Sequence, residues 1–210
     1  MTLRDDLRAL KVFAPDTQPF DTDAAPADPL DLFEQWLAAA IAAEVSAPHA
    51  MVLATTSSDG APTARTLLLK DVTAEGLWFA SFSSSPKGRD LAHDPRCALV
   101  LYWREQGRQV RVTGSVAVGP RSVSERDFLA RHPRARIAAI AGRQSEPMID
   151  VQAAIDAAEA AGDNYVPDDW TAYVVSPETV EFWQSGADRE QVRLRYEKRD
   201  DNWSSALIWP

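Results

Sequence analysis

The sequence contains one cysteine, three histidines and no long uninterrupted apolar run. Cys97 has no partner for an intramolecular disulfide, and its apolar surroundings favour a buried strand residue over a reactive thiol. The three histidines, His49, His93 and His132, are too dispersed to predict a metal site. The apolar stretches fall short of the roughly 20 residues that span a bilayer, and the first residues lack the apolar core of a secretory signal. We therefore expect a cytoplasmic protein with no membrane partner.

Several nucleotide-binding and hydrolase motifs are also absent from the sequence. It contains no G-x-G-x-x-G, no G-x-x-x-x-G-K-[ST] and no G-x-S-x-G, which leaves the classes that those motifs define without support. The net charge of −9 argues against an electrostatic nucleic-acid binder but permits a local basic pocket for one small anion. With 45% hydrophobic and 25% charged residues over 210 positions, the composition is that of a globular chain with a sizeable core.

The chain divides by composition into an N-terminal arm and one larger domain. Residues 1–27 are rich in Asp, Pro, Ala and Thr, which predicts a mobile arm before a single domain at 28–210. Asp28 and Pro29 indicate the start of a helix, with an Asp cap and proline at the first helical position. Its buried stripe is predicted from apolar residues at helical spacing: Leu30, Phe33, Leu37 and Ile41.

From residue 50 onward the hydrophobic period becomes that of β-strands. Strands are expected at 50–56, 62–70, 76–83, 96–103, 109–118, 171–175, 180–183, 191–197 and 202–208. Helices are expected near Pro86 and across 121–162. Many short strands interrupted by helices predict a mainly β fold of the α+β class, an antiparallel barrel with helical insertions. Parallel winding is disfavoured because most connections are too short for crossovers.

The segment Ser83–Arg89 has the composition of an anion site. Ser85 is placed to cap a helix whose first residue is Pro86, which leaves backbone N–H groups free at the positive end of the helix dipole. Lys87 and Arg89 add formal charge beside those donors, an arrangement suited to a phosphate. A capped surface helix with solvated cations is the alternative from local sequence.

Two further groups of cations are open to more than one interpretation. Arg65 and Lys70 bracket an apolar strand, but strict alternation puts them on opposite faces, which favours two separate strand-end cations. Arg193 and Arg195 share one face of a later strand near Trp183, where they would suit a planar anion. An exposed basic strand opposite acidic neighbours explains the same pattern equally well.

The order of these segments resembles the pyridoxamine 5′-phosphate oxidase family, over about Pro29 to Pro210. The resemblance is carried by five segments in register: Arg65–Lys70, Ser85–Lys87, Gln109–Val112, Gln144–Ser145 and Glu181–Gln184. It implies a homodimer of antiparallel split β-barrels that binds two FMN molecules at the subunit interface.

The resemblance also implies roles for individual residues. An FMN-binding role is implied for Arg65, Leu67, Lys70, Ser81, Ser85, Lys87, Gln109, Gln144, Ser145, Trp183 and Arg193. Lys70 and Arg193 would in addition stabilise negative charge on the reduced flavin. Arg131, Arg189 and Gln191 would orient the substrate, with Arg189 suited to pairing with a carboxylate.

The substrate side departs from the family's vitamin B6 oxidases. The position of their tyrosine holds Asp127, that of their serine holds Ala135, and the histidine of an Arg-x-His pair is replaced by Gln191. An acid at 127 would repel a phosphate dianion by about 1 kcal/mol or more in a partly buried site. Leu101–Glu105 and Gln144–Glu146 look closer to the flavin oxidases of phenazine biosynthesis, although that branch usually keeps the Arg-x-His pair.

The resemblance and its departures together predict an FMN-dependent oxidase with a changed substrate. It would transfer a hydride from a small planar nitrogen-containing or dihydro-aromatic ring to the flavin, and then pass the electrons to O₂ to give H₂O₂. The alternatives are an oxidase that makes pyridoxal 5′-phosphate from pyridoxine or pyridoxamine 5′-phosphate, a non-catalytic flavin- or haem-binding split barrel, and a purely structural homodimer.

Overall fold

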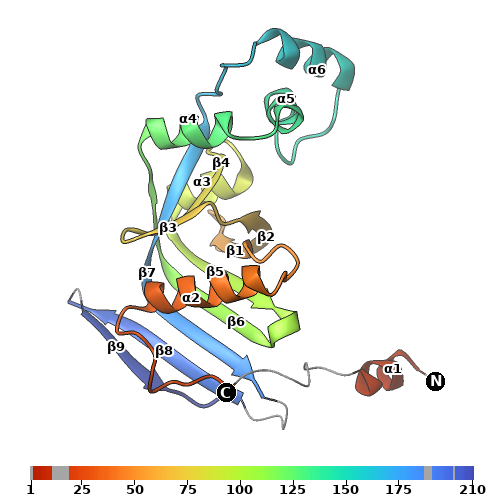
Figure 1. Cartoon of the computed structure of the whole chain (residues 1–210). Helices are drawn as coiled ribbons and strands as arrows, with labels where there is room; N and C mark the ends of the chain where they lie inside the picture. Colours follow the sequence, from red (N-terminus) through yellow and green to blue (C-terminus); the bar gives the residue numbers. More distant parts are fainter. Residues whose placement is uncertain (1, 11–18, 187–190, 201) are drawn as a thin grey trace. The chain divides into compact units, whose positions relative to one another are not determined.

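The computed structural model describes residues 2–10, 19–186, 191–200 and 202–210 (Figure 1). Its helices are α1 (Leu3–Ala9), α2 (Pro29–Ala42), α3 (Pro86–His93), α4 (Arg121–Leu129), α5 (Pro133–Ala141) and α6 (Val151–Ala160), with a 3₁₀ turn at Arg104–Gln106. Its strands are β1 (Ala50–Thr56), β2 (Pro62–Leu68), β3 (Asp71–Thr73), β4 (Gly76–Phe82), β5 (Arg96–Trp103), β6 (Arg108–Val118), β7 (Trp170–Ser185), β8 (Gln191–Arg199) and β9 (Asn202–Leu207). The expected mainly β fold with helical insertions is confirmed.

Hydrogen bonds join the strands in the order β2-β1-β5-β6-β7-β4-β3, with β8 beside β7 and β9 beside β8. The pairs β3–β4, β4–β7, β7–β8 and β8–β9 are antiparallel. The chain forms two compact units. The first comprises Met1–Met51, Leu99–Thr113 and Glu178–Pro210, and the second Val52–Ala98 and Gly114–Pro177.

Helix α2 of the first unit begins as predicted and buries a different face. The Asp28 carboxylate accepts a hydrogen bond from the Leu30 N–H at 2.8 Å, with Pro29 in the first turn. The predicted stripe is wrong apart from Phe33, because Leu30 and Leu37 are only half-buried and Ile41 is 59% exposed. The buried side chains of the helix are Pro29, Leu32, Phe33, Trp36 and Ala40.

Trp36 explains the rotation of the buried face. Its ring lies 5.1 Å from that of Phe182 on β7 and 4.9 Å from that of Phe20, both edge-on. The Arg108 guanidinium carbon lies 4.5 Å from the centre of the same ring. A tryptophan buries more apolar surface than any other residue in the helix, so its packing decides which side faces inward.

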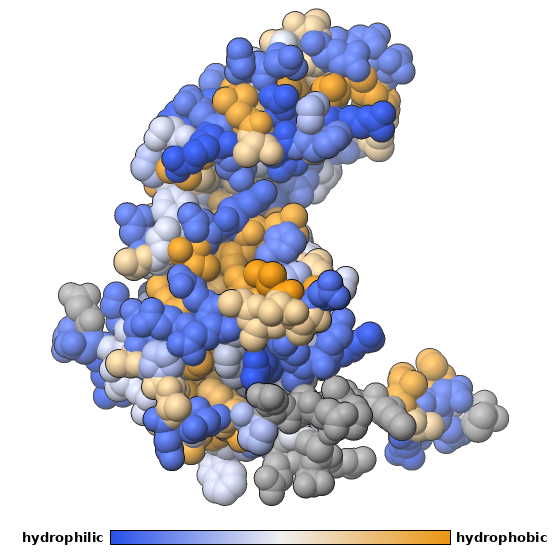
Figure 2. Space-filling view, in the orientation of Figure 1, coloured by the Kyte–Doolittle hydropathy of each residue, from blue (hydrophilic) through white to orange (hydrophobic). Residues whose placement is uncertain are grey.

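The residues before α2 include a short helix and one anchored stretch. All residues of α1 are exposed, and its apolar side chains form an orange patch at the lower right of Figure 2. Nearer to α2, the Tyr196 hydroxyl donates a hydrogen bond to the Pro26 carbonyl at 2.8 Å. The mobile arm at 1–27 and the single domain at 28–210 stay predictions.

One long strand replaces two that the sequence predicts. Strands expected at 171–175 and 180–183 are parts of β7, which runs continuously through Pro177. The first half of β7 pairs with β4 up to Val175, and the second half pairs with β8 from Thr179. Pro177 falls between the two registers, where its missing N–H costs no hydrogen bond on that edge.

The second unit packs α4 against the first half of β7. The Ser124 hydroxyl accepts a hydrogen bond from the Ala172 N–H at 2.9 Å, and Phe128 lies edge-on to Trp170 at 5.3 Å. Val123 packs on a core cluster that contains Trp78 and Ala172. The helical stretch expected at 121–162 is divided into α4, α5 and α6. This packing fixes the face of α4 that carries the candidate site.

Candidate active site

The start of α3 has the capped geometry that the sequence predicts. The Ser85 hydroxyl accepts a hydrogen bond from the Gly88 N–H at 3.2 Å and donates one to the Phe82 carbonyl at 2.7 Å. Pro86 occupies the first helical turn. A free helix N-terminus of this kind favours an anion, because its N–H groups and its dipole both attract negative charge.

Lys87 is buried at this helix start, which excludes the solvated-cation alternative for this residue. Its side chain is 3% exposed, and its ammonium donates to Ser81 Oγ at 2.8 Å, Ser85 Oγ at 3.3 Å and Gln144 Oε1 at 2.6 Å. Burial, and secondly the positive charge of Arg65, lower the pKa of Lys87 to about 8. All three partners are neutral oxygens, so a bound anion would supply the counter-charge that a buried cation requires.

Arg65 is fixed by a network that sequence reasoning missed. Its guanidinium donates to the Leu53 carbonyl at 3.2 Å and to the hydroxyls of Thr55 and Thr63, each at 2.7 Å. The Asp90 carboxylate lies 3.7 Å from Arg65 and accepts hydrogen bonds from both threonines, at 2.7 and 3.0 Å. Burial lowers the pKa of Arg65, and the charge of Asp90 opposes that shift.

The sequence contained a signal for part of this network. Thr63 precedes Arg65 by two residues on β2, so both side chains lie on one face of the strand. Asp90 follows Lys87 by three residues on α3, a spacing that places both on one side of the helix. The contact between the two elements is a tertiary feature that neither spacing predicts.

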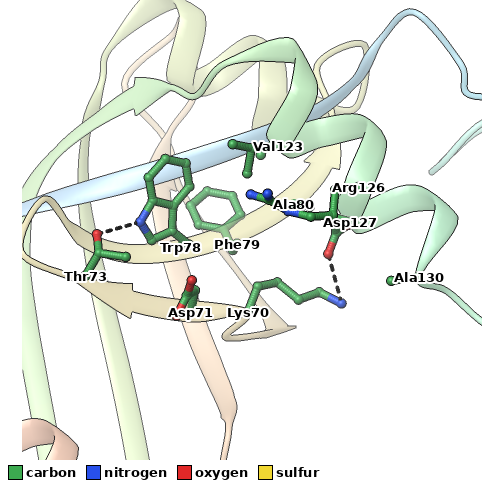
Figure 3. A pocket seen from close by; sticks show the side chains of 11 residues that line it. Lys70, Asp71, Thr73, Trp78, Phe79, Ala80, Val123, Arg126, Asp127 and Ala130 are labelled. Atoms are coloured by element: carbon green, nitrogen blue, oxygen red, sulfur yellow. Dashed lines mark hydrogen bonds and ion pairs between the residues drawn. The ribbon is translucent and has the colours of Figure 1, made fainter.

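Lys70 lies outside that network and has a different partner. Strand β2 ends at Leu68, two residues earlier than predicted, and the Lys70 N–H bonds to the Trp78 carbonyl at 2.8 Å. Its ammonium lies 3.4 Å from the Asp127 carboxylate on α4. Figure 3 shows both side chains at the edge of a cavity of about 270 Å³. Arg65 and Lys70 therefore interact with separate groups, although Lys70 lies beyond the end of the strand whose alternation the prediction assumed.

A larger cavity, of about 450 Å³, brings together several residues that the resemblance singled out. Those lining it are Leu67, Ser81, Lys87 and Gln144 from the FMN-binding set and Arg131 from the substrate-orienting set. Ala135 and Trp170 also line it, and the Arg131 guanidinium carbon lies 4.7 Å from the centre of the Trp170 ring. Ser145 follows Gln144 in an exposed loop with a positive φ of 70°.

The remaining predicted residues belong to the first unit. The Trp183 indole N–H donates to Gln191 Oε1 at 3.0 Å, and Gln109 is half-buried on β6. Glu181 lies 3.6 Å from Arg193 and 3.4 Å from Arg111, so an acid does face this strand, but the Arg193 side chain is half-buried. The flavin-binding roles of Trp183 and Arg193 stay predictions. Arg189, the proposed carboxylate partner, lies outside the described residues.

Comparisons with known proteins place this fold in a class. A family model described as pyridoxamine 5′-phosphate oxidase matches residues 37–184, and a second, described as the pyridoxine 5′-phosphate oxidase C-terminal dimerisation region, matches residues 170–210. The class is that of the split-barrel flavin oxidoreductases. The chain belongs to the pyridoxamine 5′-phosphate oxidase family, which confirms the antiparallel split barrel and the FMN-dependent oxidoreductase that the resemblance implied.

Individual relatives fall on both branches that the sequence suggested. A pyridoxine/pyridoxamine 5′-phosphate oxidase of Thermosynechococcus vestitus is 40% identical over 195 residues, which cover 90% of this chain and 92% of the relative. One of Haemophilus influenzae is 40% identical over 188 residues, or 87% of this chain and 90% of the relative. The structure of PhzG from Burkholderia lata, in complex with tetrahydrophenazine-1-carboxylic acid, matches with a TM-score of 0.85 and 29% identity, over 92% of this chain and 99% of that one.

The residues present fit the phosphate of FMN. A capped helix start and a buried ammonium without a charged partner in its hydrogen-bond set supply the donors and the positive charge that a phosphate dianion needs. Within the described ranges, no cluster of His, Cys, Asp and Glu has the composition of a metal site. No described helix is long and apolar enough to cross a membrane.

Proposed function

We propose that this chain is an FMN-dependent oxidase of a small planar ring, nitrogen-containing or dihydro-aromatic, of the phenazine type. The observation that carries the proposal is buried Lys87 beside a cavity that also contains Gln144 and Arg131. A phosphate-binding group and a substrate-orienting cation thus line one space. In the reaction, the ring loses a hydride and a proton and becomes more aromatic, and O₂ takes up two electrons and two protons as H₂O₂.

FMN, when bound, supplies the two-electron acceptor, and the residues of this chain bind and orient. Ser81, Ser85 and Lys87 hold the phosphate, and Arg131 pairs with an acidic group of the ring substrate. Gln191 replaces an ionisable imidazole with an amide, so this position orients without exchanging a proton. A ring that gains aromaticity needs no strong base.

Oxidation of pyridoxine or pyridoxamine 5′-phosphate is the second candidate. Relatives named for that activity are 36–42% identical over at least 84% of this chain, and Lys70 and Arg131 are retained. Asp127, Ala135 and Gln191 argue against it, since each removes a group that the vitamin B6 oxidases use. The phenazine-type substrate is favoured by Asp127, by Ala135 and by the ligand of the Burkholderia lata structure, whereas Gln191 departs from both branches.

We also propose that the protein is a homodimer, because residues 170–210 match a dimerisation region. Light scattering on the purified protein measures the mass directly. A mass of twice 23.1 kDa is expected, and a monomer that retains flavin would contradict this part of the proposal.

The proposed activity is tested by a visible spectrum of the purified protein, followed by anaerobic mixing with two substrates. A yellow protein is expected whose colour is bleached by a dihydrophenazine carboxylate and restored by O₂. Bleaching by pyridoxine 5′-phosphate alone would establish the second candidate instead. A yellow protein that neither ring reduces would indicate a flavin-binding module, and a colourless protein that takes up no FMN would refute the assignment of Lys87.

A further inference from the structure

The cavity in Figure 3 contains charges of both signs in equal number. Lys70 and Arg126 contribute the positive charges, and Asp71 and Asp127 the negative ones. The aromatic rings of Trp78 and Phe79 form part of its wall. The formal charge of this lining is zero, whereas a site for a phosphate dianion requires an excess of positive charge.

Asp127 is held in place on both of its oxygens. Oδ1 lies 3.4 Å from the Lys70 ammonium, and Oδ2 accepts a hydrogen bond from the Trp170 indole N–H at 3.0 Å. The side chain of Asp127 is 15% exposed, and that of Lys70 is 34% exposed. A partly buried ion pair with a second hydrogen bond is more persistent than a surface pair, so Asp127 neutralises Lys70 in the resting protein.

Arg131 contacts the same tryptophan as Asp127 does. Its guanidinium stacks over the Trp170 ring at 4.7 Å, and its Nε is buried with no hydrogen-bond acceptor among the residues that the structure describes. A buried unpaired donor is costly, and a ligand oxygen would satisfy it. Trp170 therefore connects a neutralised cation, Lys70, to a cation that still has an unused donor, Arg131.

We propose that Asp127 is a specificity-determining residue that restricts the substrate to rings with at most one negative charge, such as a monocarboxylate. It does so by removing Lys70 from anion binding and leaving Arg131 as the cation that pairs with the acidic group. This inference rests on the proposed function in one respect: it assumes that the ligand bound near Asp127 and Arg131 is the ring substrate. The same chain with an uncharged residue at 127 would accept a phosphate dianion.

The test uses FMN-loaded protein and ligands that cannot be oxidised, so that equilibrium binding is measured by calorimetry without turnover. The ligands are 4-deoxypyridoxine 5′-phosphate, its form without the phosphate, and phenazine-1-carboxylate. For Asp127→Asn we expect at least a ~10-fold gain in affinity for the phosphate ligand, equivalent to about 1.4 kcal/mol, and less than a ~3-fold change for the other two. The amide oxygen keeps an acceptor for Trp170, so the thermal midpoint should change little.

Asp71→Asn is the matched control, because Asp71 lines the same cavity and the substitution removes the same charge. The Asp71 carboxylate accepts a hydrogen bond from the Val72 N–H at 2.9 Å. We expect less than a ~3-fold gain in phosphate affinity, since Lys70 stays paired. An equal gain in both variants would overturn the proposal, because the effect would then be a general one of net charge.

The double variant Lys70→Met/Asp127→Asn provides a second test, because it removes the ion pair without changing the formal charge of the cavity. Its phosphate affinity should stay within ~3-fold of that of the wild type, since the cation that Asp127→Asn releases is absent. A ~10-fold gain that persists in the double variant would overturn the proposal. Wild-type protein that binds the phosphate ligand as tightly as the carboxylate would do the same. Failure of turnover with every ring would refute the proposed oxidase but leave this binding pattern intact.

Discussion

The affinity of the FMN-free protein for FMN should fall as the pH rises from 7 to 9, because Lys87 binds the phosphate only in its charged form. In the FMN-free state burial lowers the pKa of Lys87 to about 8, so the ammonium loses its proton within this range. The second ionisation of a phosphate monoester has a pKa near 6, so the phosphate is already largely a dianion at pH 7 and changes little up to pH 9. A bound dianion stabilises the ammonium and raises its pKa, so binding takes up a proton above pH 8.

The size of the effect follows from this pKa. At pH 7 nearly all Lys87 is charged, and at pH 9 about one molecule in ten is, so the dissociation constant should rise about tenfold between the two. Lys87→Gln removes the titrating group. Loss of the charge-assisted hydrogen bonds should weaken binding by about 1.5–3 kcal/mol, or roughly 10- to 150-fold at pH 7.

Quenching of free FMN fluorescence on addition of FMN-free protein measures the constant at each pH. The wild type should show the tenfold rise, and Lys87→Gln should show weaker binding that is nearly independent of pH. A flat wild-type profile, or the same slope in both proteins, would refute the reasoning that a buried ammonium at this site binds the phosphate.

The other predictions concern stability, measured by chemical unfolding. Relative to Lys87→Gln, the free energy of unfolding of the FMN-free wild type should rise by up to about 3 kcal/mol between pH 8 and 10.5, because folding no longer buries a charge once Lys87 has lost its proton. An equal pH dependence in both proteins would contradict this. Trp36→Ala should lower the free energy of unfolding by about 3–5 kcal/mol and Ile41→Ala by less than about 1, because only Trp36 is buried. The reverse order would show that the helix buries the face predicted from sequence. Asp28→Ala should cost about 1 kcal/mol through loss of the helix cap, and no change would show that the cap is dispensable. Gly76→Ala should prevent or severely weaken folding, since its φ is 138° and a Cβ would lie 1.9 Å from the Val175 carbonyl oxygen, and a stable variant would contradict the close approach of β4 and β7.

Much of the local structure could be predicted from residues that are neighbours in sequence. The Asp28 and Ser85 caps and the first strand at Ala50–Thr56 all depend on the conformational preferences of a few adjacent residues. The two strands expected at 171–175 and 180–183 are one strand, β7, which contains Pro177. A proline usually interrupts a strand, but here it falls where β7 changes partners.

The candidate site was predictable in its members but not in their arrangement. Motif order identified Lys87 and Gln144, yet their hydrogen bond joins residues 57 positions apart. The departure at position 127 was visible in sequence, whereas its ion pair with Lys70 was not. The partners of Arg65 were missed for the same reason, because Asp90 reaches it from a different element.

By itself, the sequence determined the family, the FMN cofactor, the mainly β architecture and the starts of α2 and α3. Motif order and short-range backbone preferences are written in consecutive residues. Only the tertiary structure decided which side of α2 is buried, that Lys87 is enclosed by neutral oxygens and that Asp127 neutralises Lys70. Burial and ion pairing depend on which distant side chains are brought within a few ångströms, and that is set by packing of the whole unit.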